Sequence, residues 1–309
     1  MRFGLHLDND RTNSPRDAIS AWRKSVAIAD TTGFDYISVV DHLVPFPSFR
    51  PKQIPLFDPW QLLADFAAQT CNVTLLTLVS NGSIAHPVRL AKQVATLDVL
   101  SDGRMMLGLG AGGYEADEAA IGMPIRTQSE RLARLSECID VLSTLWNGGD
   151  TSANGRFYPL DGYTSSPSPV SSPKLLIAGK SRQILRLAAH KASACNFAFT
   201  EIGALDALIK RLQTDLLAAG RNLQTFEVTL LDRVFVGASD EVAEQAWRAA
   251  GAPTVLGHRG LIGGVAKVVR DLKFLQKTGV NTIFCMFQNP ESVSRFAHEV
   301  LPQLQQHQV

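Results

Sequence analysis

The chain has little net charge and no long hydrophobic run. Its 309 residues carry 30 lysine and arginine side chains against 29 aspartate and glutamate side chains, a formal net charge of +1. This balance is not typical of proteins that bind nucleic acid through basic surfaces. No apolar stretch approaches the roughly 20 residues that span a bilayer, and Met1–Leu7 runs directly into polar residues instead of a signal-peptide core. We therefore expect a cytoplasmic protein without a nucleic-acid or membrane partner.

Cysteine is scarce, and the four cysteines stand far apart. Cys71, Cys138, Cys195 and Cys285 form no C-x-x-C pair, so the usual sequence signatures of a zinc site or a redox dithiol are lacking. An isolated cysteine in a protein interior behaves as a small apolar residue. We accordingly predict four buried structural cysteines and no metal site.

Short β-branched or apolar runs alternate along the chain with longer segments of helical periodicity. This alternation is typical of parallel strands joined by crossover helices. Eight β/α units form a (β/α)₈ (TIM) barrel, and α/β barrels of this length commonly form one domain. The sequence therefore predicts an α/β fold in which residues 1–309 form a single TIM barrel. The eight predicted strands are Arg2–Leu7, Tyr36–Val40, Thr74–Ser80, Met105–Leu109, Lys174–Ala178, Cys195–Phe199, Thr225–Val236 and Thr282–Phe287.

A doubly wound sheet is the competing architecture, because the glycine-rich segment Gly108–Gly113 resembles a dinucleotide-binding turn. Such turns follow the first strand of the fold, and an acidic residue closes the next strand about 20 residues further on. Here the glycines follow the fourth predicted strand, and no acidic residue takes that place. The pattern favours the barrel.

Three segments rich in proline, glycine or serine interrupt the β/α pattern, at Val44–Pro55, Gly148–Pro173 and Ala250–Gly263. Loops of this length in a compact domain are usually functional or disordered. They are either inert surface loops or insertions at the C-terminal ends of the strands, where barrel enzymes place their active sites. We expect the second, with all three segments walling a cavity.

Polar and glycine residues follow several predicted strands, and in a barrel such positions converge on one mouth. His42 can act as an acid, a base or a hydrogen-bond donor, although a structural role accounts for a lone histidine equally well. Asp41 is expected to fix its loop by hydrogen bonding. The segments concerned are Asp41-His42, Ser80–Ser83, Gly110–Glu115 and Gly179–Arg182.

Two of these segments suit a bound coenzyme. Gly110-Ala111-Gly112 carries little side-chain bulk, so a flat ring or a phosphate can approach the main chain closely. In the second segment Gly179 is followed by Ser181, an expected N-cap of a helix whose free N–H groups and positive dipole end attract anions. Lys180 and Arg182 add cationic donors, although as solvated surface charges they need no ligand. We favour a phosphate cradle.

A long motif carries a family resemblance. His86-Pro87, then Leu90–Arg104 and then Leu107–Gly112 resemble the luciferase-like monooxygenase family. Three further stretches agree in order and spacing, so the resemblance covers nearly the whole chain. It implies an eight-stranded barrel with insertions that binds a flavin-type coenzyme at the strand ends. These three stretches are Gly33–His42, Lys174–Phe199 and Val265–Phe284.

Within the family, Asp41-His42 followed by Phe46 resembles the branch that uses the deazaflavin coenzyme F420. The resemblance implies that His42 lies near the reactive carbon of the coenzyme. It also implies that Gly179, Lys180 and Ser181 take the coenzyme phosphate. The edge of the isoalloxazine ring would be held by Thr77, Leu78, Val79, Ser80 and Asn81, often with a non-prolyl cis peptide among them.

The leading functional hypothesis is hydride transfer between coenzyme F420 and an unknown small organic substrate, with His42 as the catalytic proton partner or an orienting hydrogen-bond donor. An FMN-dependent monooxygenase acting with reduced flavin and a catalytically silent flavin-binding barrel are the alternatives. Some F420 dehydrogenases place a glutamate where this chain has Gly113, and the first acidic residue here is Glu115. A sugar-phosphate dehydrogenase mechanism is therefore doubtful. The resemblance also implies a homodimer formed through outer helices.

Overall fold

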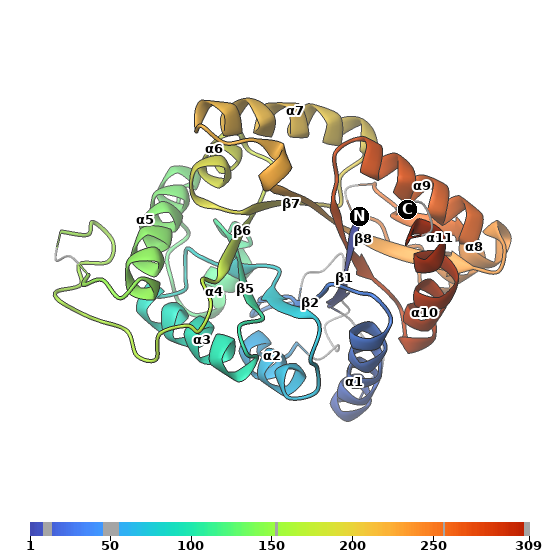
Figure 1. Ribbon diagram of the computed structural model, residues 1–309, viewed down its shortest axis with the longest axis horizontal. Coiled ribbons are helices and arrows are strands. Elements are labelled where there is room, and N and C mark those ends of the chain that lie inside the picture. Colours follow the sequence, from blue (N-terminus) through green and yellow to red (C-terminus); the bar gives the residue numbers. More distant parts are fainter. Residues whose placement is uncertain (9–13, 46–55, 152–153, 256, 306–309) are drawn as a thin grey trace.

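A computed structural model describes residues 1–8, 14–45, 56–151, 154–255 and 257–305. Eight parallel strands close into a ring in which each strand pairs with the next and the last, β10, pairs with both β1 and β8. The predicted TIM barrel is confirmed, and the strand order rules out the doubly wound alternative (Figure 1). The barrel strands are β1 (Arg2–Leu7), β2 (Tyr36–Val39), β3 (Thr74–Thr77), β5 (Met105–Gly110), β6 (Lys174–Ala178), β7 (Ala194–Ala198), β8 (Glu227–Gly237) and β10 (Thr282–Met286).

Two short strands lie outside this ring. The predicted strand Thr74–Ser80 is divided, because β3 ends at Thr77 and a separate strand β4 (Ser80–Asn81) pairs with the end of β5. A second short strand, β9 (Leu261–Gly264), pairs with the C-terminal part of β8. Most of β9 lies inside the predicted loop Ala250–Gly263, because its sequence Leu-Ile-Gly-Gly is too short and too rich in glycine to predict a strand.

Helices surround the ring, and several begin at a residue whose side chain caps the first turn. Ser14, Asp58, Thr127, Ser181 and Ser239 each accept a hydrogen bond from a backbone N–H of the turn that follows. None of the helices in the described ranges combines the length and the apolar character needed to cross a membrane. The helices are α1 (Pro15–Thr31), α2 (Pro59–Ala67), α3 (Pro87–Leu100), α4 (Glu115–Ala120), α5 (Gln128–Trp146), α6 (Arg182–Lys191), α7 (Ile202–Ala218), α8 (Asp240–Ala249), α9 (Val265–Lys277), α10 (Pro290–Arg295) and α11 (Leu301–Gln305).

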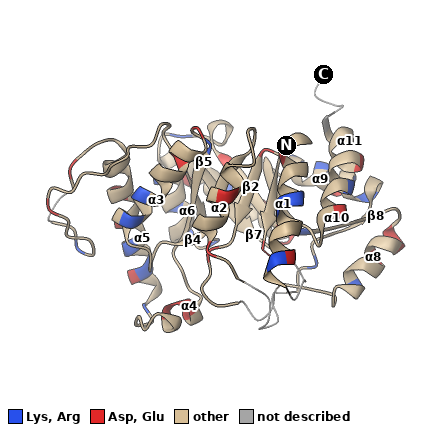
Figure 2. Cartoon of the chain, turned by 90° about the horizontal axis from the view of Figure 1, so that it is seen from below, with Lys and Arg blue, Asp and Glu red and all other residues tan. Residues whose placement is uncertain are grey.

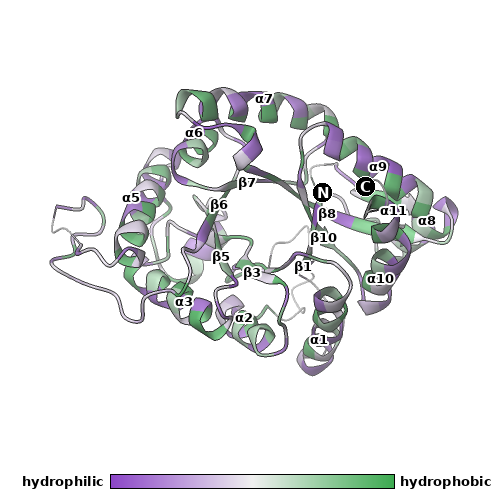
Figure 3. Cartoon of the chain, in the orientation of Figure 1, coloured by the Kyte–Doolittle hydropathy of each residue, from purple (hydrophilic) through white to green (hydrophobic). Residues whose placement is uncertain are grey.

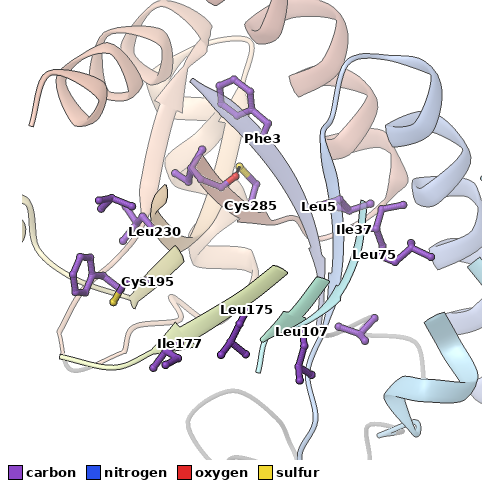
Figure 4. Close-up of a cluster of buried hydrophobic side chains, with 14 of the residues drawn as sticks. Phe3, Leu5, Ile37, Leu75, Leu107, Leu175, Ile177, Cys195, Leu230 and Cys285 are labelled. Atoms are coloured by element: carbon purple, nitrogen blue, oxygen red, sulfur yellow. Dashed lines mark hydrogen bonds between the residues drawn. The ribbon is translucent and has the colours of Figure 1, made fainter. Parts of the chain in front are cut away.

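The main hydrophobic core lies between the outer face of the barrel and the helices. Outward-facing strand side chains such as Leu5, Ile37 and Leu107 pack in one cluster with helix residues such as Val26 and Leu90 (Figure 4). The surrounding helices carry both hydrophobic and hydrophilic residues (Figure 3). This core holds the ring rigidly, so the residues at the strand ends are presented from a fixed frame.

A polar network occupies the N-terminal end of the barrel interior. The Arg2 guanidinium donates to the Tyr36 hydroxyl at 2.6 Å and pairs with the Glu227 carboxylate at 2.8 Å. Tyr36 and Thr282 both donate to the same Glu227 carboxylate. Above this network the Phe284 ring lies against Gly4, where a Cβ atom would approach it to 2.2 Å. Side chains therefore fill the interior at this end.

The three expected insertions differ in whether their described residues line the cavity. Val44, Pro45 and Val255 line the cavity described below, and most of Val44–Pro55 lies outside the described residues. The expectation for Gly148–Pro173 is wrong, because none of its described residues lines that cavity. It leads from α5 to the start of β6, and its Ser171 hydrogen-bonds Asp98 on α3 at 2.8 and 2.9 Å. It lies at the outer edge of the molecule (Figure 1).

Three of the four cysteines are buried as predicted, namely Cys138, Cys195 and Cys285. Burial raises the pKa of the Cys138 and Cys195 thiols to about 12, so neither carries a thiolate near neutral pH. The prediction is wrong for Cys71, which is exposed in the turn after α2. Its backbone N–H binds the Asp30 carboxylate, so this turn is held by polar contacts rather than by burial.

Candidate functional site

A cavity of about 510 Å³ opens at the C-terminal ends of the barrel strands. This is within the usual size range of small-molecule and cofactor sites. Most of the sequence-predicted site residues line it, although they come from four different strand ends. These residues are Asp41, His42, Leu78, Val79, Ser80, Asn81, Gly110, Ala111, Gly112, Gly179 and Lys180.

Three predicted site residues do not line the cavity, and two of them have a structural role instead. The Thr77 hydroxyl is buried and donates to the Gly108 carbonyl at 3.0 Å. The Ser181 hydroxyl accepts from the Ile184 N–H and so caps α6, as the sequence predicted. Arg182 is exposed at the first position of α6. Only Gly179 and Lys180 of the predicted cradle therefore reach the cavity wall.

The segment between β3 and β4 forms one wall. The non-prolyl cis peptide implied by the family resemblance joins Leu78 and Val79. The glycines of β5 fit against this segment, since a Cβ on Gly108 would lie 2.1 Å from the Thr77 carbonyl oxygen, and one on Gly110 would lie 3.0 Å from Val79. Packing thus requires glycine at position 108 and leaves little room at position 110, whereas the sequence suggested only close approach of a ligand.

The loop after β5 packs closely on the loop after β4. Gly112 has a positive φ of 74°, which favours glycine. A Cβ there would also approach the Asn81 side-chain oxygen to 2.5 Å. That oxygen accepts from the Ser83 N–H at 3.0 Å, and the Ser83 hydroxyl donates to Glu118. These contacts therefore hold the main chain of both loops in place.

His42 is held by a carboxylate that the sequence analysis missed. Its Nδ1 lies 2.7 Å from Oδ2 of Asp117 on α4, and its ring contacts Tyr114 edge to face. The other oxygen of Asp117 accepts from the backbone N–H groups of Leu43 and Val44 at 2.9 and 3.0 Å. Burial opposes the charge of Asp117, but these hydrogen bonds outweigh it and hold its pKa below the ordinary value.

Asp117 belongs to α4, which lies beyond the C-terminal ends of the strands, at the opposite end from the N-terminus (Figure 2). The helix has acidic residues at Glu115, Asp117 and Glu118, a pattern that resembles a solvated helix start. Only Glu115 is exposed, whereas Asp117 and Glu118 are buried. The sequence could have indicated a site role for Asp117 only through the position of this helix directly after a barrel strand.

Two further charged groups border the cavity. Burial raises the pKa of Asp41, and the neighbouring Ser80 hydroxyl opposes this effect. Partial burial lowers the pKa of Lys180, whose amino group donates to the Phe199 carbonyl at 3.4 Å. A cationic group thus lies on the β6–β7 side of the cavity, and an aspartate lies on the β2 side.

The deeper wall contains polar side chains that the sequence analysis did not name. His6 on β1 lies with Nδ1 2.9 Å from the Ser38 hydroxyl, and the Asn196 amide on β7 donates to Thr229 at 2.7 Å. Both line the cavity and are almost completely buried. They occupy inward-facing positions of strands, which the period of two along a strand can identify once the barrel is assumed.

A charged cluster around Asp232 of β8 lies beside the mouth. His258 contacts the buried Asp232 carboxylate at 2.8 Å through Nε2 and Glu201 at 3.0 Å through Nδ1. The hydrogen bond with Asp232 raises the pKa of His258 to about 9, against the effect of burial and with support from Glu201. Since Val255 in the same loop lines the cavity, this cluster fixes part of the wall.

The family assignment agrees with this geometry. A family model described as luciferase-like monooxygenase matches residues 1–280. The chain belongs to this family. Among the solved structures of similar shape is a riboflavin lyase with modified FMN and riboflavin, at a TM-score of 0.86 and 17% identity, covering 99% of this chain and 91% of that one. At so low an identity the likeness shows the shared fold alone.

The curated relatives of this luciferase-like chain are of two kinds. The F420-dependent glucose-6-phosphate dehydrogenase of Nakamurella multipartita is 30% identical over 223 residues, which cover 71% of this chain and 65% of the relative. The oxygenase component of the flavin-dependent trigonelline monooxygenase of Acinetobacter baylyi is 27% identical over 256 residues, covering 80% of this chain and 68% of the relative. The matched part thus spans about two thirds of each relative.

Proposed function

We propose that the chain is an oxidoreductase that binds a deazaflavin or flavin coenzyme in this cavity and, more narrowly, that it transfers a hydride between coenzyme F420 and a small organic substrate. The observation that carries the proposal is His42, a titratable group on the cavity wall held by a buried carboxylate. Two relatives with F420- and flavin-dependent names support the coarser class.

The cavity residues suit a flat coenzyme with a phosphate-bearing side chain. Leu78-Val79 and Gly110-Ala111-Gly112 line one wall, where the glycines add no side-chain bulk. Gly179 and Lys180, next to the start of α6, place backbone and a cationic donor on a neighbouring part of the wall. We propose that the first surface holds the ring and the second holds the phosphate.

The proposed reaction balances with one proton-accepting group on the protein. When an alcohol is oxidised to a carbonyl, its carbon loses a hydride and its oxygen loses a proton. The bound coenzyme supplies the hydride acceptor, as cofactors supply the redox chemistry in such enzymes. The imidazole of His42 accepts the hydroxyl proton, and in the reverse direction the imidazolium returns it to the carbonyl oxygen.

A reduced-flavin monooxygenase is the second candidate function. It is favoured by the trigonelline monooxygenase relative and by the largely apolar walls of the cavity, which include Phe199, Leu231 and Met286. Such walls exclude water from a reactive site. A barrel that binds flavin without catalysis is the third. Gly113 stands where some F420 dehydrogenases carry a glutamate, so we do not propose glucose 6-phosphate as the substrate.

Binding and turnover assays separate the three candidates. The purified protein is titrated separately with coenzyme F420 and with FMN, and each complex is then mixed with a panel of alcohols and ketones with and without oxygen. We expect tighter binding of F420 and an absorbance change that depends on the substrate but not on oxygen. Tighter binding of FMN with coupled oxygen consumption would establish the monooxygenase. Binding without turnover of any panel member would favour the silent barrel.

We also propose that residues 1–309 act as one barrel domain in the cytoplasm and that the chain pairs into the homodimer that the family resemblance implies. Light scattering on a size-exclusion column measures the mass directly. A mass near twice the 33.6 kDa of the chain is the expected result, and a mass near 33.6 kDa would contradict the dimer.

A further inference from the structure

We propose that Asp117 is a positioning residue that fixes the tautomer of His42, so that Nδ1 carries the ring proton and Nε2 is the nitrogen that exchanges protons with the substrate. This inference rests on the proposed function for its chemical meaning. The tautomer itself is a property of the protein alone and can be measured without substrate or coenzyme.

The two carboxylate oxygens of Asp117 bind different partners. Oδ1 accepts two backbone N–H groups, from Leu43 and Val44, at 2.9 and 3.0 Å. Oδ2 lies 2.7 Å from Nδ1 of His42. Because an ionised carboxylate only accepts hydrogen bonds, Nδ1 must donate. In the neutral imidazole the other nitrogen, Nε2, then carries no proton and is the one that can accept a proton.

The environment keeps this carboxylate ionised and in place. Only 1% of the Asp117 side chain is exposed, and its hydrogen bonds hold its pKa below the ordinary value. Tyr114, three residues earlier, donates to the Pro45 carbonyl at 3.0 Å and packs edge to face on His42. Tyr114 and Asp117 therefore hold the loop after β2 at four points: the imidazole, two N–H groups and one carbonyl.

Substitution of Asp117 by asparagine reverses the hydrogen-bonding demand on His42. The amide has a single oxygen, and the N–H groups of Leu43 and Val44 both require an acceptor. The oxygen therefore stays on the backbone side, and the NH₂ group faces Nδ1. That nitrogen must then accept, so the ring proton moves to Nε2. The opposite amide orientation would set NH₂ against two backbone donors and leave both unsatisfied.

The experiment is ¹⁵N NMR of histidine-labelled protein at about pH 9, where an ordinary imidazole is neutral. His42→Ala identifies the resonances, and the long-range ¹H–¹⁵N pattern reports which nitrogen carries the proton. We expect the Nδ1–H tautomer in the wild type and the Nε2–H tautomer in Asp117→Asn. Glu115→Gln, an exposed change on the same helix, is expected to keep the wild-type tautomer.

Two parallel measurements separate positioning from general damage. Glu118→Gln removes the neighbouring buried carboxylate, which binds Ser83 rather than His42, so it is expected to lower the unfolding temperature without changing the tautomer. Coenzyme affinity, measured with F420 and with FMN, is expected to change less than threefold in Asp117→Asn, because Asp117 does not line the cavity.

The wild-type spectrum can overturn the inference by itself, if it shows the Nε2–H tautomer. An unchanged Nδ1–H tautomer in a folded Asp117→Asn protein would overturn it as well. The proposed function fails separately, if neither coenzyme binds, and that result leaves the tautomer assignment standing.

Discussion

At the residue scale, the site depends on contacts that join distant parts of the chain. His42 and Asp117 are 75 positions apart, yet they form the hydrogen bond that orients the candidate proton carrier. The sequence identified His42 because it follows a strand, but it could not decide between a structural and a catalytic role. The structure adds the buried carboxylate partner, an arrangement that enzymes use to orient an imidazole.

Replacement of His42 by alanine is expected to affect chemistry more than binding. A proton carrier stabilises charge that develops only in the transition state, so kcat should fall by roughly 10² to 10⁴ while coenzyme affinity changes little. Steady-state kinetics with a substrate from the alcohol and ketone panel, together with coenzyme titration, measure both quantities. Normal turnover of the variant would show that the role of His42 is structural. A collapse of affinity with kcat preserved at saturation would make it a coenzyme anchor.

Replacement of Gly179 by valine is expected to weaken coenzyme binding at least tenfold. Gly179 has a φ of +144°, and a Cβ there would lie 3.0 Å from Ile184, so valine must displace the cradle backbone. Gly220→Val is the matched control, because Gly220 also has a positive φ but lies after α7, away from the cavity. Equal coenzyme affinity in both variants would remove Gly179 from the proposed phosphate site.

The residues that sequence reasoning misplaced show which information was lacking. Lys180 lines the cavity, whereas Arg182, two residues later at the first position of α6, does not. A glycine–lysine–serine–arginine motif does not show at which residue the helix begins or which side chains then point away from the cavity. Asp117 was missed for a related reason, since an acidic helix start usually faces solvent. In both cases the orientation of a short element decides the role, and composition does not encode that orientation.

At the scale of secondary-structure elements, the β8–β9 junction is held by a charge cluster. His258 bridges Asp232 on β8 and Glu201 at the start of α7, and the following residues lead into β9. The contact with Asp232 raises the pKa of His258 to about 9. A histidine that is more basic in the folded state stabilises the fold at pH values where it is protonated.

This cluster predicts a loss of stability at alkaline pH. The contribution of His258 is complete below its unfolded pKa of about 6.5, and it disappears as the pH rises through about 9. Across this pH window the unfolding free energy of the wild type should therefore fall by on the order of 1 to 3 kcal/mol more than that of His258→Gln. Urea unfolding at a series of pH values measures the difference. His190→Gln, on the exposed side of α6, is the control, and parallel curves for wild type and His258→Gln would refute the prediction.

The long elements were predictable because periodic apolar patterns specify them strongly. The eight barrel strands were each located within a few residues. Short elements were not, because β4 has two residues and β9 has four, too few for a period to be recognised. The predicted strand Thr74–Ser80 was continuous in pattern but is divided after Thr77, where the chain fits around the glycines of β5.

At the scale of the whole molecule, the barrel closes where the first strand meets the last. Gly4 on β1 pairs in register with Phe284 on β10, and the Phe284 ring occupies the space that a side chain at position 4 would need. The absence of a Cβ atom at position 4 therefore makes room for the Phe284 ring at the packed N-terminal end of the interior.

Replacement of Gly4 by alanine is expected to destabilise the barrel. The added Cβ would lie 2.2 Å from the Phe284 ring, and overpacking of this kind costs about 1 to 3 kcal/mol. Chemical denaturation of the wild type and the variant measures the loss. Gly203→Ala on α7, where a Cβ meets nothing within 4 Å, should leave stability unchanged or slightly raised. Equal stability of Gly4→Ala and wild type would show that the seam adjusts at no cost.

The sequence by itself determined the barrel class, the order of its strands and the set of strand ends that could meet at one mouth. It could do so because apolar residues repeat every two positions in strands and every 3.6 positions in helices, and this spacing can be read from neighbouring residues. Only the tertiary structure decided which of those residues reach the cavity and which carboxylate holds His42. Those outcomes depend on packing between residues far apart in the chain, such as Asp117 against Leu43 and Gly108 against Thr77, and no local pattern records such contacts.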